Sequence, residues 1–241
     1  MKKPSKKSSA PKKVVKAKTG ELVEPDYWRQ LDLFSPEKFG DKPVHVIGVG
    51  ATGSWTAYLL AKMGVTNLHL WDFDHVEAHN LPNQLFRLQD VGKPKVEALA
   101  RIIKETTGIK PTVHNVAVTG DTKLTGVVFL LVDKMDVRQS IWKGAIKFKL
   151  AVDFMVETRM AIDNGRVYAI KPSNPGDIKL WEGTLYSSKE AEPSVCTNIS
   201  ICPTVAMIAS FAAWKLIKWS RGEEYQRELI ICARPSIVTG G

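Results

Sequence analysis

Apolar residues recur along the chain in two patterns, short continuous runs and longer stretches with one apolar face at helical spacing. The continuous runs predict buried strands at residues 44–48, 67–71, 112–116, 127–132 and 150–153. The helical spacing predicts helices at residues 53–63, 93–107 and 137–148. Because these strands and helices alternate, we expect an α/β protein with a mostly parallel, doubly wound sheet and helices on both of its faces.

The pattern changes in the second half of the chain. Asp163-Asn164-Gly165 is a turn sequence typical of a β-hairpin, which we expect residues 158–162 and 166–170 to form. Beyond the hairpin we expect a polar crossover loop, a long closing helix and a last strand, at residues 171–193, 203–219 and 228–233.

Two earlier segments follow neither pattern. Residues 27–34 mix aromatic and charged side chains, and we expect them to form a short docking segment. Residues 74–90 contain a proline and show no clear period, which predicts a long loop with a functional role.

The net charge of +9 is concentrated near the N-terminus. Eight of the 34 basic residues lie within residues 1–20, which contain no acid, and the rest nearly balance the 25 acidic residues. This Lys-rich segment lacks aromatic residues, so we expect a disordered tail, followed by a single domain at residues 21–241. A nearly neutral domain requires no nucleic acid partner, and no apolar stretch is long enough to predict a membrane span.

The chain contains three cysteines, Cys196, Cys202 and Cys232. This number does not make a disulfide framework or a four-thiolate zinc site. Reduced thiols are the natural state in the cytoplasm, so we expect a cytoplasmic protein and no zinc.

A glycine motif follows the first predicted strand directly. Gly48, Gly50 and Gly53 fit G-x-G-x-x-G, in which the first glycine permits a tight turn, the second lets phosphate approach the backbone and the third packs helix on strand. Asp72 ends the second strand, where a carboxylate can accept the ribose hydroxyls. The motif predicts a Rossmann-like nucleotide site, but it does not decide between a redox dinucleotide and ATP.

Further motifs occur in a fixed order along the chain. They are Arg29-Gln30, Asp-x-Asp-x-Val at 72–76, Asn-Leu-x-x-Gln at 80–84, Asp-Val-Gly-Lys-Pro-Lys at 90–95 and Asp-x-x-x-x-Arg at 133–138. This ordered set resembles the ThiF/MoeB/HesA superfamily, the adenylating domain of ubiquitin-activating enzymes. The stretch at 153–160, DFMVETRM, resembles the compact bacterial and phage members, which are often linked to ubiquitin-like or sulfur-carrier proteins.

The resemblance implies an ATP-dependent adenylyltransferase that activates the C-terminal carboxylate of a small β-grasp protein, either ubiquitin-like or a sulfur carrier. Lys95, at a helix start, is placed to neutralise phosphate charge, and Asp133, at the end of a strand, suits Mg²⁺. Asn80 and Gln84 are neutral donors for phosphate or ribose. Arg29 in this family reaches the nucleotide of the opposite protomer, so a homodimer is implied.

Each of these residues also has a simpler interpretation. Asp133 is a possible helix cap and Lys95 a possible solvated helix charge. Arg29 and Arg138, taken singly, are better interpreted as partners in surface salt bridges, and only the ordered set of motifs favours a functional role.

The sequence departs from the family pattern at Asn83. The family usually carries an arginine there that contacts the ATP phosphates, whereas in this chain Arg87 is the nearest arginine of the same loop. If Arg87 supplies the missing charge, the protein is expected to adenylate its substrate. If it does not, adenylation is expected to be slow or the protein to be a catalytically silent, nucleotide-binding subunit.

Cysteines at about the place of Cys196 form a thioester or acyl-disulfide with the activated protein in some relatives. A thiolate near a helix N-terminus suits that chemistry, because the helix dipole lowers the pKa of the thiol. Cys202 lies nearer the predicted helix start but is expected to be structural, and Cys232 is expected to be packed within its strand.

Two other functions stay open at this point. A nicotinamide-dependent oxidoreductase is supported only by the glycine motif and Asp72, and it gives the loop from Asn80 to Lys95 no role. Adenylation of a small-molecule or RNA carboxylate is also compatible with the sequence, because the substrate is recognised by the crossover and the sheet rather than by the nucleotide site.

Overall fold

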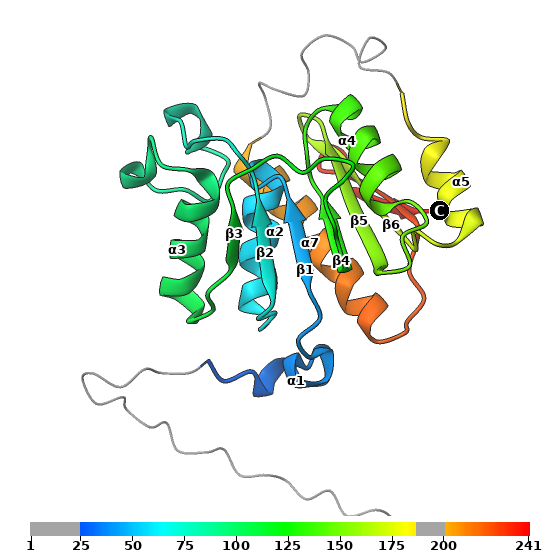
Figure 1. The fold of residues 1–241 in the computed structure, drawn as a ribbon, viewed down its shortest axis with the longest axis horizontal. Coiled ribbons are helices and arrows are strands. Elements are labelled where there is room, and N and C mark those ends of the chain that lie inside the picture. The colour runs from blue at the N-terminus through cyan, green and yellow to red at the C-terminus, as the bar shows by residue number, and fades with distance from the viewer. Residues whose placement is uncertain (1–24, 187–200) are drawn as a thin grey trace, which may run out of the picture.

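One eight-stranded sheet runs through the protein, with helices on both faces, in a computed structural model that describes residues 25–186 and 201–241 (Figure 1). The strands are β1 (Val44–Ile47), β2 (Leu68–Trp71), β3 (Thr112–His114), β4 (Gly126–Leu130), β5 (Val152–Met160), β6 (Asn164–Ile170), β7 (Glu228–Cys232) and β8 (Ile237–Gly240). Their order across the sheet is β3-β2-β1-β4-β5-β6-β7-β8. The first five strands are parallel, and β6, β7 and β8 pair antiparallel at one edge. The predicted Rossmann-like α/β class is confirmed.

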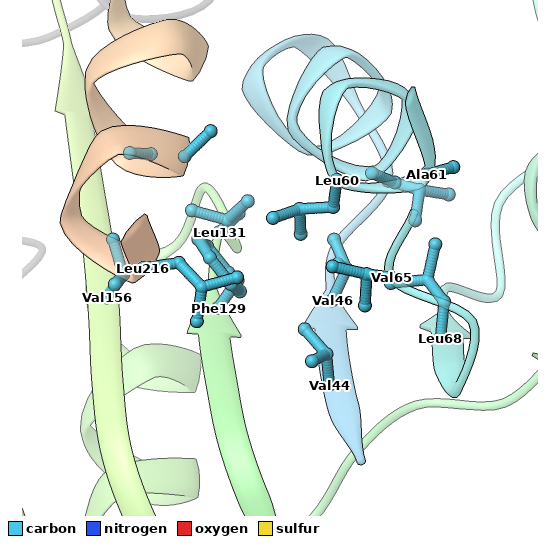
Figure 2. Close-up of a cluster of buried hydrophobic side chains, with 14 of the residues drawn as sticks. Val44, Val46, Leu60, Ala61, Val65, Leu68, Phe129, Leu131, Val156 and Leu216 are labelled. Atoms are coloured by element: carbon cyan, nitrogen blue, oxygen red, sulfur yellow. The ribbon is translucent and has the colours of Figure 1, made fainter. Parts of the chain in front are cut away.

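The helices divide between the two faces of the sheet. One face is covered by α2 (Ala51–Lys62), α3 (Lys95–Thr107) and α7 (Cys202–Ser220), and the other by α4 (Met135–Ile141), the π-helical turn η4 (Trp142–Ile146) and α5 (Pro175–Glu182). Figure 2 shows the first of these two cores, in which Leu60 of α2 and Leu216 of α7 meet strand residues such as Val46 and Phe129. Short helical turns occur at η1 (Trp28–Gln30), α1 (Pro36–Phe39), η2 (Ala78–Asn80) and η3 (Leu88–Asp90).

The structure corrects the strands predicted near residue 155. Residues 150–153 and 158–162 were expected as two strands, but β5 is a single strand of nine residues that starts at Val152, while Leu150 lies exposed before it. The charged Glu157 lies in the middle of this strand, between the two predicted ones. The side chain of Glu157 is nevertheless buried, because two arginines pair with it. The predicted hairpin joins β5 to β6.

Two elements were not predicted. Helix α5 lies within the segment 171–193, which was expected to be a loop and of which residues 171–186 are described. Strand β8 is exposed at every position and is held by pairing with β7 rather than by burial, so it has no apolar pattern to detect. The predicted tail at residues 1–20 lies outside the described residues.

The N-terminal segment lies at the end of the sheet where β1 begins, as Figure 1 shows. Phe34 is buried in the core, and Gln30 Nε2 donates a hydrogen bond of 2.6 Å to the carbonyl of Met63, which follows α2. The docking predicted for residues 27–34 is therefore confirmed. Within the described ranges, no helix combines the length and apolarity that crossing a membrane requires.

Three histidines lie side by side on β1, β2 and β3 and need to be neutral. His69 Nε2 lies 2.9 Å from Asn67 Oδ1 and its Nδ1 lies 3.1 Å from His114 Nε2. His45 Nδ1 accepts from Trp71 Nε1 at 3.1 Å. With Asn67 Oδ1 as acceptor, His69 donates from Nε2 and accepts from His114 at Nδ1. A further proton on His69 would face the N–H of His114, and one on His45 Nδ1 would face the indole N–H of Trp71.

Burial and the neighbouring imidazoles lower the pKa of His45 to about 4. The pKa values of His69 and His114 are also lowered by burial, against which the charge of Asp41 raises that of His69. Since the unfolded chain binds a proton near pH 6.5 and folded His45 only near pH 4, stability is lost as the pH falls through this window.

We expect the acid loss to be smaller in His45→Gln than in the wild type. The His45 contribution is on the order of 3 kcal/mol between pH 6.5 and pH 4, because each unit of pKa is worth about 1.4 kcal/mol. The measurement is the free energy of unfolding by urea at several pH values. His79→Gln, at an exposed histidine, is the matched control and should keep the wild-type slope. Equal slopes in all three proteins would contradict the assignment.

Candidate nucleotide-binding site

The candidate site lies where the strand order reverses. The chain passes from β1 outward to β2 and β3 and then returns to β4 on the other side of β1. The loops after β1 and β4 therefore start side by side at the carboxyl ends of these strands and lead to helices on opposite faces of the sheet. In open α/β sheets this is the place where ligands bind.

The glycines of the motif have different steric roles. A Cβ on Gly48 would lie 2.9 Å from the Leu131 carbonyl oxygen, so the loops after β1 and β4 touch there, and Gly48 also has a positive φ of 86°. A Cβ on Gly53 would lie 1.8 Å from the Gly48 oxygen, which shows how closely α2 packs on the loop. A Cβ on Gly50 would meet nothing within 4 Å. The open space in front of Gly50 and the start of α2 is where an anion would be received.

Asp72 holds the glycine loop in place. One carboxylate oxygen accepts the amide hydrogen of Val49 at 2.8 Å, and the other accepts that of Asp74 at 2.9 Å. A carboxylate has about four acceptor positions, so Asp72 keeps capacity for ribose hydroxyls while it ties the loop. Asp72 is therefore both a candidate ribose ligand and a structural part of the loop.

Lys95 is not a solvated helix charge. Its side chain is 9% exposed at the first turn of α3, and its Nζ lies 3.0 Å from the carboxylate of Asp74. The backbone amide of Lys95 also donates to the Asp74 carbonyl at 2.9 Å. These two bonds join the two ends of the long loop after β2. They place the ammonium group of Lys95 beside Asp74, two residues after Asp72.

Asp133 is exposed and follows β4 two residues after Leu131, whose carbonyl oxygen lies beside Gly48. It does not cap α4, because the residue at the cap position is Lys134 and no side chain accepts a hydrogen bond there. No hydrogen bond or ion pair joins Asp133 to another side chain within the described part of the chain. The helix-cap interpretation is wrong, and the carboxylate is available to a ligand.

Arg138 is buried rather than part of a surface salt bridge. Its side chain is 5% exposed, and its Nε lies 3.1 Å from Glu157 Oε1. Its Nη2 donates to the carbonyl oxygen of Val132 at 2.5 Å. The two ends of the Asp-x-x-x-x-Arg motif are therefore in contact, because Arg138 donates to the backbone of Val132, the residue before Asp133.

Asn80 and Gln84 belong to the loop that packs on the first turns of α2. Asn80 is buried, and its Oδ1 accepts the amide hydrogen of Glu77 at 2.9 Å, whereas its carbonyl accepts that of Gln84 at 2.9 Å. The Oε1 atom of Gln84 is buried with no hydrogen-bond partner among the residues described. The loop touches α2 where the Leu85 amide donates to the hydroxyl of Ser54 at 3.1 Å.

Two arginines lie away from the glycine loop. Arg87 forms a 2.5 Å ion pair with Glu105, which follows Lys95 by ten positions and so lies about 15 Å along α3 at 1.5 Å per residue. Arg29 is exposed beside Gln30, at the end of α2 opposite the glycine loop. The length of α2 separates Arg29 from Gly50, about 18 Å for 12 residues. Neither side chain reaches the loop of its own chain in this arrangement.

Sequence reasoning missed two buried carboxylates near the site. Asp90 is fully buried, accepts the amide of Arg87 at 3.0 Å and pairs with Arg101, so it fixes the loop after β2. Glu157 pairs with Arg138 and Arg159. Asp90 is the first residue of the motif at 90–95, so the motif could have identified it as a site residue. No pattern along the chain identifies Glu157.

The cysteines are placed only in part. Cys202 is the first residue of α7 and Cys232 the last of β7, and both are half-buried free thiols. Cys232 Sγ lies 3.3 Å from the Arg234 carbonyl, so it is less enclosed than expected. Cys196 lies outside the described residues.

The side chains fit a nucleoside triphosphate. The glycine loop leaves space for phosphate, Asp72 binds that loop from the end of β2, and Lys95 supplies a buried cation. Within residues 25–186 and 201–241, no three His, Cys, Asp or Glu side chains gather as a metal-ligand group. Mg²⁺ is often bound by one or two protein carboxylates together with substrate phosphates, so Asp133 would be the residue to hold it and the ion would neutralise phosphate charge.

Known proteins resemble this chain in sequence. The ThiF family model matches residues 28–236. Ubiquitin-like modifier-activating enzyme 5 of Drosophila persimilis is 34% identical over 126 residues, which cover 44% of this chain and 32% of that enzyme. The enzyme of the same name from Caenorhabditis briggsae is 31% identical over 134 residues, which cover 53% of this chain and 28% of the relative. The chain thus matches less than half the length of these relatives.

Solved structures share the fold. E. coli MccB, crystallised with ATP, has a TM-score of 0.65 at 16% identity, over 86% of this chain and 65% of that chain. PaaA has a TM-score of 0.66 at 18% identity, with the same coverage of 86% and 65%. At these identities the likeness concerns the fold.

Proposed function

Because the chain belongs to the ThiF family, whose model matches residues 28–236, we propose that it is an ATP-dependent adenylyltransferase. Its substrate is the C-terminal carboxylate of a small β-grasp protein, ubiquitin-like or a sulfur carrier. A carboxylate oxygen attacks the α-phosphorus of ATP, the bond to the β-phosphate oxygen breaks, and pyrophosphate leaves. The products are a protein acyl-adenylate and pyrophosphate.

The observation that supports this proposal is the switch point between β1 and β4, where Gly50 faces open space, Asp72 holds the glycine loop and Lys95 is buried beside Asp74. Asp133 follows the neighbouring strand β4. Lys95 neutralises phosphate charge as pyrophosphate departs. Asp133 holds Mg²⁺, which supplies further charge neutralisation when bound. A nicotinamide enzyme would use the glycine loop and Asp72 but has no use for the other two side chains.

The test is isotope exchange between ATP and pyrophosphate. Candidate partners are small β-grasp proteins with a free C-terminal carboxylate, each compared with the same protein amidated at that carboxylate. We expect exchange only with the free carboxylate, because the amide cannot attack the phosphorus. Exchange that is the same with both forms, or saturable binding of NADH in preference to ATP, would exclude the proposed reaction.

We also propose a homodimer in which Arg29 acts on the nucleotide of the partner. The support is the position of Arg29, which lies a full helix length from the glycine loop of its own chain. Contact between Arg29 and a nucleotide therefore requires a second chain.

This arrangement predicts complementation between two inactive variants. Arg29→Ala and Asp133→Asn each remove one component, and a mixed dimer contains one site with both native residues. After unfolding and refolding together in equal amounts, we expect about a quarter of wild-type exchange, since half of the dimers are mixed and each holds one intact site of two. A mixture no more active than its separate components would show that Arg29 does not act across the dimer.

A catalytically silent, nucleotide-binding subunit is the second candidate. It is favoured by Arg87, which pairs with Glu105 on α3 instead of replacing the family's phosphate-binding arginine. ATP binding without exchange, and exchange restored by a second subunit, would select this alternative.

Two further parts of the proposal concern the thiols. Transfer of the activated carboxylate to Cys196 would form a thioester, detectable as a mass increase that hydroxylamine removes. The free thiols of Cys202 and Cys232 are consistent with a reducing compartment, and we propose a cytoplasmic location.

A further inference from the structure

A buried carboxylate within β5, paired in register with the last residue of β4, is shared by two arginines. Glu157 is completely buried, with Arg138 Nε at 3.1 Å from one oxygen and Arg159 Nε at 3.1 Å from the other. The indole of Trp181 also donates to Glu157, at 3.1 Å. Removing three charges from water is costly, and well-packed apolar side chains of similar volume often serve stability as well or better. The cluster therefore calls for an explanation other than stability.

One arm of the cluster leads to the backbone that carries Asp133. Arg138 Nη2 donates to the carbonyl of Val132 at 2.5 Å and to that of Thr158 at 3.3 Å. The Val132 carbonyl is part of the planar peptide group that joins Val132 to Asp133. Because this group is rigid, holding its oxygen also fixes the position of the Asp133 Cα. Glu157 orients the guanidinium that holds this plane.

The other arm reaches two further segments. Arg159 donates to the carbonyl of Thr184 at 2.7 Å and to its hydroxyl at 2.9 Å, after α5. Thr158, the residue between Glu157 and Arg159 in sequence, has its hydroxyl 3.1 Å from that of Thr52 in the first turn of α2. The end of β4, the start of α2 and the segment after α5 are thus joined through three consecutive residues of β5.

We propose that Glu157 is a positioning residue of the nucleotide site. It orients Arg138, which fixes the peptide before Asp133, and Arg159, which fixes Thr184. The proposal rests on the proposed function for its catalytic consequence but not for its structural one. Removal of the carboxylate leaves the buried guanidinium of Arg138 and the half-buried one of Arg159 without their shared anion, and they reorient away from one another.

The structural consequence is tested without nucleotide, by hydrogen–deuterium exchange of residues 131–138. In Glu157→Gln we expect amides of this segment to exchange about tenfold faster, the ratio that corresponds to about 1.4 kcal/mol. The matched control is Glu182→Gln, because Glu182 also accepts from an indole, that of Trp142, and from the cation of Lys147, both at 2.7 Å. It should leave this segment at the wild-type rate.

Arg138→Lys is the second variant, for the case in which Glu157→Gln does not fold. A lysine amine keeps the charge beside Glu157, but it lacks the planar guanidinium whose Nε pairs with Glu157 while its Nη2 donates to the Val132 carbonyl. We expect the same local increase in amide exchange. Wild-type amide rates in residues 131–138 of either folded variant would overturn the proposal.

The catalytic consequence is measured by ATP–pyrophosphate exchange over a range of Mg²⁺ concentrations. We expect kcat of Glu157→Gln to fall about a hundredfold, since a misplacement of about 1 Å has that effect. We also expect the half-activating Mg²⁺ concentration to rise, with KM for ATP little changed. Simple loss of folded protein would lower the rate equally at all Mg²⁺ concentrations, and that outcome overturns the proposal. If the wild-type protein shows no exchange, the proposed function fails, and the amide rates alone decide the positioning.

Discussion

Gly53→Ala is expected to lower Tm by about 10 °C or more, a loss of at least about 3 kcal/mol. The added Cβ would lie 1.8 Å from the carbonyl oxygen of Gly48, which is backbone and cannot rotate away. Alanine in a helix interior is worth only about 1 kcal/mol over glycine. The clash therefore outweighs the gain in helix propensity, and α2 must move away from the loop after β1.

Gly50→Ala is the matched control for this prediction. A Cβ there meets nothing within 4 Å, so we expect Tm to stay within about 2 °C of the wild type. The same methyl group projects into the space where phosphate would approach, so ATP binding measured by calorimetry should weaken. Similar Tm values for Gly53→Ala and the wild type would contradict the close packing of α2 on the glycine loop.

Asp133→Asn is expected to reduce ATP–pyrophosphate exchange by at least about a hundredfold, the usual size of losing one charge-stabilising group in an active site. Asparagine has nearly the same shape but lacks the charge that suits Mg²⁺. Since Asp133 is exposed and makes no hydrogen bond within the described residues, Tm should not change. Loss of activity without loss of stability is the signature of a group that acts on the ligand.

The control for Asp133 is Asp136→Asn, three residues later on the first turn of α4 and also exposed. The Asp136→Asn variant should catalyse ATP–pyrophosphate exchange at the wild-type rate, because Asp136 belongs to the first turn of α4 and not to the segment directly after β4. Exchange by Asp133→Asn within a factor of about two of the wild type would remove Asp133 from the site.

Much of the fold follows from local patterns. The strands around Val46 and Phe129 are buried at every position and mostly apolar because parallel strands are covered on both faces, and such strands are found easily. The glycine motif and Asp72 were found because turn geometry and a hydrogen bond to Val49 impose residue types at fixed spacing. These constraints act within a few residues or between neighbouring strands.

The parts that were missed depend on contacts distant in sequence. Glu157 looks like an interruption of a strand until Arg138 and Arg159 are placed beside it. Strand β8 has no buried position and is specified by β7 alone. Arg87 was a reasonable substitute for the family's arginine by proximity in sequence, but the packing of α3 offers it Glu105 instead.

The double role of Asp72 limits how this site can change in evolution. In a loop held by other means, replacing the acid would alter ribose recognition and leave the phosphate cradle intact. In this protein the same carboxylate fixes the Val49 amide, so any substitution that changes ligand preference also releases the loop. Ligand preference and loop shape are therefore inherited together, and a switch to another nucleotide would require compensating changes before Asp72 could be lost.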